Sequence, residues 1–190
     1  VYAGIGCNRS EGGTFDGSVT IRGNVIGLSA NPNGAAGIYL DGSGASDQVT
    51  IGGTLVDNRN TISYSAGVTG VSAGPGIRLE NIEELTIENN EIAHNGSSGL
   101  LLLDVTTAWP HIRNNDIFDQ TAGAGINIGG ASQITVGTNN AIYNNQAGIA
   151  FFVSTNADLS GGTASSEPVT INDNEIYGNT FAGIAVRDPI

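Results

Sequence analysis

Lysine and methionine are both missing from this 190-residue chain, and only one cysteine is present. All of the basic residues are arginine, and 6 of them against 18 acidic residues give a formal net charge of −12. Such a surface repels the phosphates of nucleic acids and of anionic membranes, so we expect neither as a partner. No apolar run reaches the roughly 18 residues that a transmembrane helix needs, so membrane insertion is not expected.

The shortage of cysteine and histidine also narrows the possible chemistry. Cys7 is the sole cysteine, so no internal disulfide can form, and no Cys or His cluster has the spacing of a zinc site. Charged residues make up 13% of the chain and apolar residues 39%, which indicates a folded domain rather than a disordered acidic segment. We therefore predict a single domain over residues 1–190, without a metal and without a cofactor.

The chain does contain a phrase of three short apolar segments that recurs about six times. The first segment is rich in β-branched residues and occurs at 19–21, 49–51, 85–87, 110–112, 134–136 and 169–171. The second begins with asparagine and occurs at 24–26, 60–62, 90–92, 115–117, 140–142 and 174–176. The third begins with glycine and an aliphatic residue, at 37–38, 76–77, 99–100, 125–126, 148–149 and 183–184, with an extra copy at 4–5.

Each segment has the length of a short strand. Side chains alternate along a strand, so the outer residues of the first segment face inward and its middle residue faces outward. A spacing of 23 residues separates Gly76 from Gly99 and Gly125 from Gly148, which is too short for a βαβ unit but fits three strands with tight turns. We predict an all-β fold, a single-stranded right-handed parallel β-helix of about six coils, with each strand paired to its copy one coil later.

One asparagine opens the second segment of every coil. This column consists of Asn24, Asn60, Asn90, Asn115, Asn140 and Asn174. Asparagine tolerates the left-handed backbone conformation better than most residues, so we expect it to form the bend between two strands. Stacked asparagine side chains can also bond to one another along the axis. Both reasons predict a structural role for the column.

Two stretches carry a resemblance to a known family. Residues 87–92 read Ile-Glu-Asn-Asn-Glu-Ile before the third segment at 99–100, and residues 49–54 lead on to the segment at 60–62. These phrases resemble the parallel β-helix repeats of the pectate-lyase-like superfamily, and the resemblance extends over nearly the whole chain. It implies the fold but not one function, since that superfamily contains lyases, hydrolases, epimerases, phage tailspikes, adhesins and inert scaffolds. Its lyases typically hold calcium with several aspartates, and this sequence has no tight run of Asp of that kind.

The second segments carry the best candidate for a site. Their outward positions hold carboxylates in three coils, namely Glu91, Asp116 and Glu175. Two residues further on, also outward, are the aromatic residues Phe118, Tyr143 and Tyr177. Aromatic rings beside carboxylates suit carbohydrate binding, and neighbouring like charges raise one pKa, as an acid/base pair requires. The alternative is an ordinary solvated sheet on which stacked aromatic rings stabilise the coils.

The remaining polar residues give weaker signals. An outward threonine column, interrupted by His111, is explained by cross-strand pairing, and the lack of a second flat row disfavours ice binding. Neither His94 nor His111 has a matched Ser or Cys, so a catalytic triad is not expected. We expect Glu88 and Arg113 to form an exposed ion pair and the acidic stretch 80–84 to be a solvated turn.

Neither end of the sequence shows an amphipathic helix that would cap a solenoid, whose free ends expose apolar core and unpaired backbone. Seven copies of the third segment stand against six of each other kind, so we expect one terminal strand to be donated to, or capped by, a partner. The residues predicted to mediate self-assembly are Val1, Tyr2, Ile5, Ile184 and Val186. Head-to-tail copies of the chain, or adjacent coils of a longer chain, would cover them.

Two functions are compatible with these observations. The first is a non-catalytic scaffold or filament module, extracellular or at the cell surface, that stacks through its uncapped ends. The second is a polysaccharide-binding or polysaccharide-cleaving protein that works through the carboxylates and aromatic residues of the second segments. We favour the first because the ends are uncapped, the chemistry is sparse and the charge density is low, and an enzyme is the less favoured alternative. A groove walled by the longer connecting segments would instead favour the second.

Overall fold

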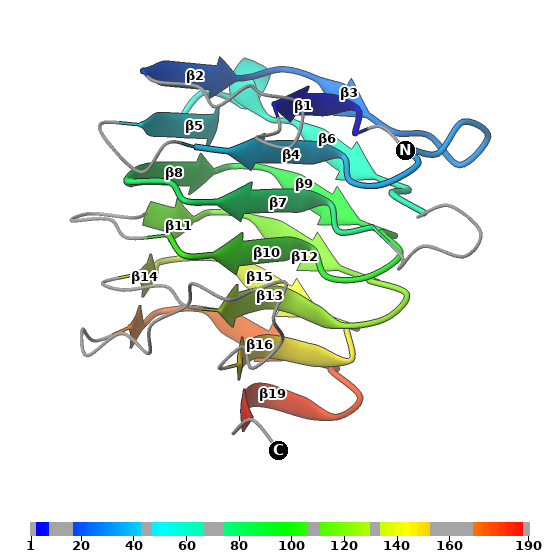
Figure 1. The fold of residues 1–190 in the computed structure, drawn as a ribbon. Helices are drawn as coiled ribbons and strands as arrows, with labels where there is room; N and C mark the ends of the chain where they lie inside the picture. The colour runs from blue at the N-terminus through cyan, green and yellow to red at the C-terminus, as the bar shows by residue number, and fades with distance from the viewer. Residues whose placement is uncertain are drawn as a thin grey trace.

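The computed structural model describes residues 3–7, 17–42, 47–66, 74–105, 111–129, 134–152 and 169–187. In these residues the chain winds as a solenoid whose strands lie in three sheets, with all neighbouring strands parallel (Figure 1). The prediction of an all-β parallel β-helix is therefore confirmed. Among the described residues, no helix is long and apolar enough to cross a lipid bilayer.

The three sheets correspond to the three recurring segments. Sheet I contains β2 (Ser18–Ile21), β5 (Gln48–Gly52), β8 (Glu84–Glu88), β11 (His111–Arg113), β14 (Thr135–Val136) and β17 (Thr170–Ile171). Sheet II contains β3 (Val25–Ile26), β6 (Thr61–Ser63), β9 (Glu91–Ala93), β12 (Asp116–Phe118), β15 (Ala141–Tyr143) and β18 (Glu175–Tyr177). Sheet III contains β1 (Ile5–Cys7), β4 (Ile38–Asp41), β7 (Ile77–Glu80), β10 (Leu100–Leu103), β13 (Ala124–Gly129), β16 (Ala147–Phe152) and β19 (Ala182–Arg187). A short 3-10 helix, η2 (Val56–Asn58), lies between β5 and β6.

The core is a continuous stack of aliphatic side chains inside the coils. Equivalent residues pair from coil to coil, as Ile87 does with Ile112 in sheet I and Ile117 with Ile142 in sheet II. These four isoleucines are fully buried and belong to one apolar cluster. Burial of such a side chain contributes about 1.5–3 kcal/mol, so each additional coil that covers the core stabilises the coil before it.

The glycine of the third segment is required by close packing between coils. A Cβ atom on Gly125 would lie 2.5 Å from Ile142 Cγ2 and 3.0 Å from the carbonyl oxygen of Gly148. Gly76 and Gly99 are equally crowded. Where a further coil follows, sheet II therefore leads into sheet III only through a residue whose side chain is a hydrogen atom, which explains the recurring Gly-Ile pair.

The asparagine column lies inside the first bend, between sheets I and II. The backbone N–H and Nδ2 of Asn90 both donate to Asn115 Oδ1 at 3.0 Å, and those of Asn115 donate to Asn140 Oδ1 at 3.1 and 3.0 Å. Equivalent bonds extend the row to Asn24 and Asn60 in one direction and to Asn174 in the other. The column is thus one unbroken row of amide hydrogen bonds, which we call the asparagine row.

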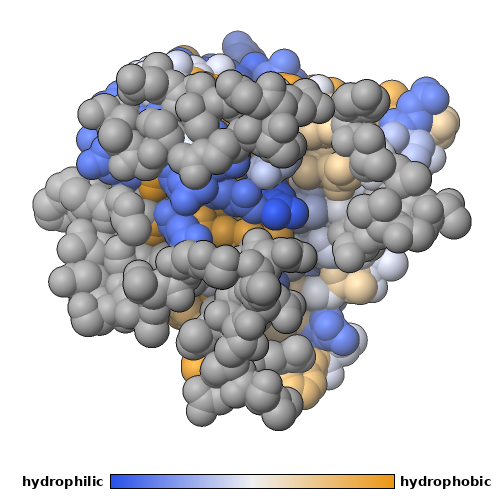
Figure 2. All heavy atoms as spheres, viewed as in Figure 1, coloured by the Kyte–Doolittle hydropathy of each residue, from blue (hydrophilic) through white to orange (hydrophobic). Residues whose placement is uncertain are grey.

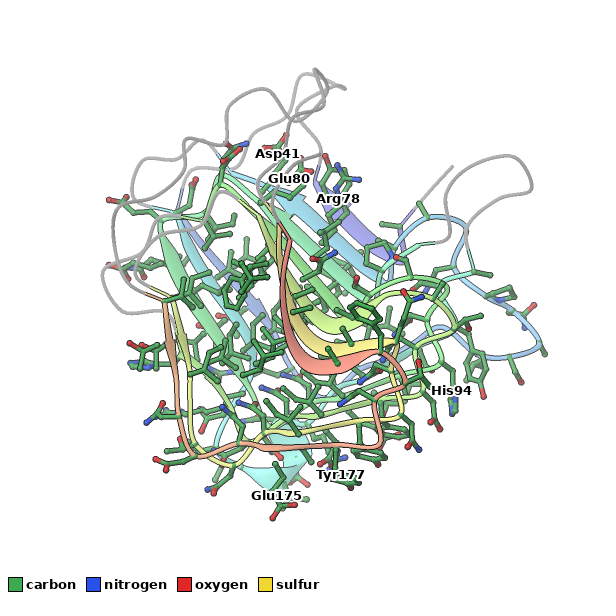
Figure 3. All side chains as sticks on the ribbon, turned by 90° about the horizontal axis from the view of Figure 1, so that it is seen from below. Asp41, Arg78, Glu80, His94, Glu175 and Tyr177 are labelled. Carbon is green, nitrogen blue, oxygen red and sulfur yellow. The ribbon has the colours of Figure 1, made fainter. Side chains whose placement is uncertain are left out.

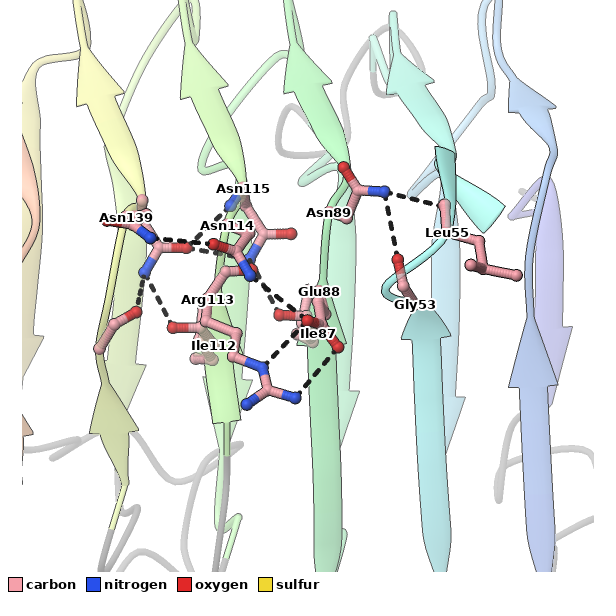
Figure 4. Close-up of polar contacts among 12 residues, drawn as sticks. Gly53, Leu55, Ile87, Glu88, Asn89, Ile112, Arg113, Asn114, Asn115 and Asn139 are labelled. Atoms are coloured by element: carbon pink, nitrogen blue, oxygen red, sulfur yellow. Dashed lines mark hydrogen bonds and ion pairs between the residues drawn. The ribbon is translucent and has the colours of Figure 1, made fainter. Parts of the chain in front are cut away.

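The left-handed conformation expected of this column belongs to the preceding residue instead. Positive φ values occur at Asn89, Asn114 and Asn139, while the asparagines of the row itself are not among the positive-φ residues. The Nδ2 atom of Asn139 donates to Asn114 Oδ1, and that of Asn89 donates to the carbonyl oxygens of Gly53 and Leu55 (Figure 4). The expectation about the backbone was therefore wrong by one residue, because the bend and the inward amide need two different side-chain directions.

A second amide row, absent from the sequence analysis, occupies the bend between sheets II and III. The backbone N–H of Asn95 donates to Gln120 Oε1 at 3.1 Å, that of Gln120 to Asn145 Oδ1 at 3.2 Å, and that of Asn145 to Asn179 Oδ1 at 3.0 Å. The residue before each member has a positive φ, as His94 and Asp119 do. Both bends are therefore built in the same way.

Replacement of Asn115 by alanine is expected to lower the free energy of unfolding by roughly 2–4 kcal/mol, because buried partners of its amide lose their hydrogen bonds. These partners include the carbonyl oxygen of Ile87 and the N–H of Asn90. Denaturant unfolding followed by circular dichroism measures the change. The exposed Asn172→Ala is the matched control, with an expected effect below about 0.5 kcal/mol. Equal losses in both variants would contradict the role of the row.

Candidate functional site

The predicted acidic residues are only partly brought together. Asp116 on β12 pairs in register with Glu91 on β9, so their side chains lie one coil apart on the outer face of sheet II. Glu175 pairs with Ala141, which in turn pairs with Asp116. Glu175 is therefore two coils from the nearest of the other carboxylates, a distance of about 9–10 Å along the axis.

An arginine that the sequence analysis did not single out joins the first two carboxylates. Arg59 follows η2 and places Nη2 3.0 Å from Glu91 Oε2 and 2.9 Å from Asp116 Oδ2. All three side chains are partly exposed, so each ion pair contributes only about 0–1 kcal/mol. The guanidinium group offsets the repulsion on which the acid/base interpretation of Glu91 and Asp116 depended. The arrangement is thus a charge-compensated cluster.

The aromatic residues form a continuous column on the same face. The ring centroids of Phe118 and Tyr143 are 4.9 Å apart with planes 3° from parallel, and those of Tyr143 and Tyr177 are 4.9 Å apart with planes at 4°. At the other end, His94 contacts Phe118 edge to face at 5.9 Å and stacks on Tyr64 at 5.3 Å. We call these five residues the aromatic column. The sequence analysis did not place Tyr64 and His94 in this column, because they occupy positive-φ bend positions rather than strands.

The geometry of the aromatic column restricts what it can bind. Because the rings of Phe118, Tyr143 and Tyr177 are stacked nearly parallel, their faces are used against one another. A sugar ring packs on an aromatic face rather than on its edge, so the interior of the column offers little to a carbohydrate. Tyr177 ends the column, and this residue is 52% exposed. Burial raises the pKa of the Tyr143 phenol, and Tyr177 and nearby carboxylates add to the effect.

A second polar cluster lies on the outer face of sheet III. The hydroxyl of Tyr39 donates to Glu80 Oε2 at 3.0 Å, and Arg78 Nε donates to Glu80 Oε1 at 2.6 Å. The Arg78 guanidinium also lies over the Tyr39 ring, 5.1 Å from its centroid. Viewed along the axis, Arg78 and Glu80 lie on the opposite side of the solenoid from Glu175 and Tyr177 (Figure 3). On this side hydrophilic residues lie beside hydrophobic ones (Figure 2).

This cluster of Tyr39, Arg78 and Glu80 contradicts part of the expectation that residues 80–84 form a solvated turn. Glu80 is the last residue of β7, and its side chain is mostly buried between Tyr39 and Arg78, so it is not part of a solvated turn. Burial raises the pKa of Tyr39 to about 12, and the charge of Glu80 adds to this effect. Burial, and then Glu80, also raises the pKa of Asp104. Tyr39 is therefore held as a neutral hydrogen-bond donor.

The ion pair predicted between Glu88 and Arg113 is present at the first bend (Figure 4). The Nε atom of Arg113 lies 3.1 Å from Glu88 Oε1. Glu88 is only 5% exposed, so the expectation of an exposed pair was wrong for the carboxylate. Asn114 Nδ2 adds a hydrogen bond to Glu88 Oε1 at 3.3 Å. A buried carboxylate needs such partners, and we infer that the pair maintains the bend.

Two shallow cavities lie over the residues that the structure describes, and the aromatic column lines neither of them. One of about 130 Å³ lies over sheet III and is lined in part by Asn127, Ala150 and Phe151. The other, of about 170 Å³, lies over sheet I between Thr50 and Thr86. In the part of the chain that the structure describes, no group of three or more His, Cys, Asp or Glu residues is arranged to hold a metal ion.

The two ends of the solenoid carry the residues predicted for self-assembly. We define the N-terminal rim as β1, β2 and β3, and the C-terminal rim as β17, β18 and β19. Ile184 and Val186 lie on the C-terminal rim and are 49% and 81% exposed. Ile5 lies on the N-terminal rim and is half-buried against the core. Val1 and Tyr2 lie outside the described residues.

Residues 3–188 match the family model described as the right-handed beta helix region, and the chain therefore belongs to this family. Neither the search of curated proteins nor the search of solved structures gave a match. The family establishes the architecture and leaves the function to be argued from the surfaces described above.

The raised pKa of Tyr39 predicts a pH dependence of stability. Its folded pKa of about 12 exceeds the ordinary value of about 10, so its contribution to stability is complete below pH 10 and is lost as the pH rises toward 12. The difference in phenolate absorbance between the wild type and Tyr39→Phe isolates this titration. We expect a midpoint near pH 12, and a lower midpoint in Glu80→Gln. A Tyr39 midpoint near 10 would contradict the burial of this phenol.

Proposed function

We propose that this right-handed β-helix protein is a non-catalytic structural module that stacks head to tail with copies of itself. The observation that carries the proposal is the exposure of core-type residues on the C-terminal rim. Ile184 is in register with Ile149, which is fully buried, and Val186 is in register with Phe151. Ile184 and Val186 are nevertheless 49% and 81% exposed. Another coil placed against β19 would cover both residues.

The hydrogen bonds of the asparagine row support the same proposal. Along the row, Nδ2 of one asparagine donates to Oδ1 of the asparagine in the next coil. Among the described residues, Nδ2 of Asn174 has no such acceptor and Oδ1 of Asn24 has no such donor. These two groups belong to opposite rims, so a second copy placed below the first would join them. Further coils of a longer chain would do so in the same way.

We propose an extracellular or cell-surface setting for this scaffold, in keeping with the adhesins and tailspikes of the superfamily that its repeat resembles. The charge of −12 on each copy opposes association at low ionic strength, and salt screens this repulsion. Stacking should therefore strengthen as salt is raised from about 10 to about 150 mM.

Light scattering coupled to size exclusion tests the proposal on the chain of residues 1–190. We expect masses above that of the monomer that increase with protein concentration, and loss of these species in Val186→Glu because a charge would be buried at the junction. Val56→Glu is the matched control, since Val56 is 84% exposed and lies on η2 between β5 and β6, which belong to neither rim. A wild type that stays monomeric at all concentrations and salt levels would refute stacking.

Polysaccharide binding is a second candidate, favoured by the end of the aromatic column. Tyr177 is exposed and shares β18 with the exposed Glu175, so a ring face and a carboxylate are available together. Sugar rings stack on exposed aromatic faces and donate hydroxyl hydrogen bonds to carboxylates. The described cavities lie elsewhere, so this candidate is limited to surface binding.

Affinity electrophoresis in gels that contain neutral or acidic polysaccharides tests the second candidate. Binding through Tyr177 predicts slower migration that is lost in Tyr177→Ala and kept in Tyr177→Phe, because phenylalanine retains the ring face. Val56→Ala serves as a control for loss of an exposed apolar side chain. Unchanged migration of the wild type in every gel would count against this candidate and leave the scaffold proposal intact.

A further inference from the structure

We propose that stacking occurs by strand exchange, in which β19 of one copy displaces β1 of the next copy and pairs with its β4. The inference rests on the proposed head-to-tail stacking and specifies the partner, a second copy of this chain, and the junction. It starts from the unequal sheets, which contain seven strands in sheet III and six in each of the other two.

The extra strand makes a simple stack impossible. Suppose that β17 and β18 of one copy pair with β2 and β3 of the next. The strand that follows β18 is β19, and the strand that precedes β2 in the second copy is β1. In such a stack, β19 of the first copy and β1 of the second would have to occupy the same position in sheet III, between β16 of the first copy and β4 of the second. If both strands stayed, sheets I and II would each lack one strand at the junction, leaving gaps of about 9–10 Å.

The register shows that β19 fits the place of β1. In β1, Ile5 pairs with Ile38, and the next two residues pair with Tyr39 and Leu40. The residues 183–186 repeat the pattern of residues 4–7, with a glycine, an isoleucine, a small residue and an apolar residue. The described part of β1 is three residues long, and β19 is six residues long. In this register β19 pairs with all four residues of β4 (Ile38–Asp41), while the described part of β1 pairs with three of them.

The space around Gly4 and Gly183 is consistent with the exchange of β1 for β19. A Cβ on Gly4 would lie 2.9 Å from the carbonyl oxygen of Gly37 and 2.9 Å from Ile26 Cγ2, so a strand that pairs with β4 needs glycine at this position. Gly183 supplies it. In its own copy, a Cβ on Gly183 would meet only Ile176 Cγ2, at 3.6 Å. The glycine at 183 is thus not required by the fold of one copy but is required by the exchanged junction.

Gly183→Ala separates stacking from folding. We expect it to unfold like the wild type, because the added Cβ makes an ordinary contact in one copy, and to associate at least about tenfold more weakly because it clashes at the junction. Gly6→Ala is the matched control, since a Cβ there would meet Ala3 Cβ at 3.4 Å, and unchanged association is expected. Wild-type stacking in Gly183→Ala would overturn the inference.

Gly4→Val and Ile5→Asp decide which strand occupies the junction. Both weaken the docking of β1, so exchange predicts stronger association, by about tenfold if β1 is otherwise docked nine-tenths of the time. A junction that keeps β1 predicts weaker association. Sedimentation velocity over a concentration series measures the effect, and circular dichroism checks the fold. If the wild type stacks while these variants stack less or equally, exchange is wrong and the scaffold proposal stands. If the wild type does not stack, the scaffold proposal itself fails.

Discussion

The asparagine row is the interaction on which the rest of the structure depends. Its amides are buried beside an apolar core, where an unpaired polar group costs about 1–3 kcal/mol. Asn115 satisfies this demand by bonding to the coils on both sides, to Ile87 and Asn90 before it and to Asn140 after it. A coil that slipped by one residue would break these bonds and turn its aliphatic residues outward. The row therefore fixes the register of every coil.

A fixed register means that equivalent positions of successive coils become neighbours on the outer surface. Side chains of one kind then meet their own kind, and the structure shows two solutions to this crowding. Aromatic rings use their faces against one another, as Tyr143 does between Phe118 and Tyr177. Carboxylates need an intervening cation, which Arg59 supplies to Glu91 and Asp116. The carboxylates and aromatic residues that resemble a binding site in the sequence therefore make contacts between coils in the structure.

The sequence alone predicted what is local and periodic. The strands, their order and the asparagine row follow from the repeating phrase, because equivalent residues of each coil take the same place in the structure. Contacts made by irregular positions were not predictable. Arg59 reaches Asp116 from the end of η2, 57 residues earlier, and nothing in the repeat marks that encounter. The second amide row was obscured because Gln120 replaces asparagine, and Tyr64 and His94 were missed because no strand pattern includes bend residues.

The same row also gives the solenoid a direction. Between asparagines of the row, Nδ2 donates toward the next coil and Oδ1 accepts from the previous one. Among the described residues, Nδ2 of Asn174 at the C-terminal rim therefore lacks such an acceptor, and Oδ1 of Asn24 at the N-terminal rim lacks such a donor. Two copies joined through the same rim would oppose donor to donor and would reverse the strand direction across the junction. Only a head-to-tail arrangement continues the row, the parallel pairing and the stack of Tyr177 onto whatever follows it. The proposed stacking therefore disfavours a symmetric dimer, and it would not terminate by symmetry but would extend copy after copy.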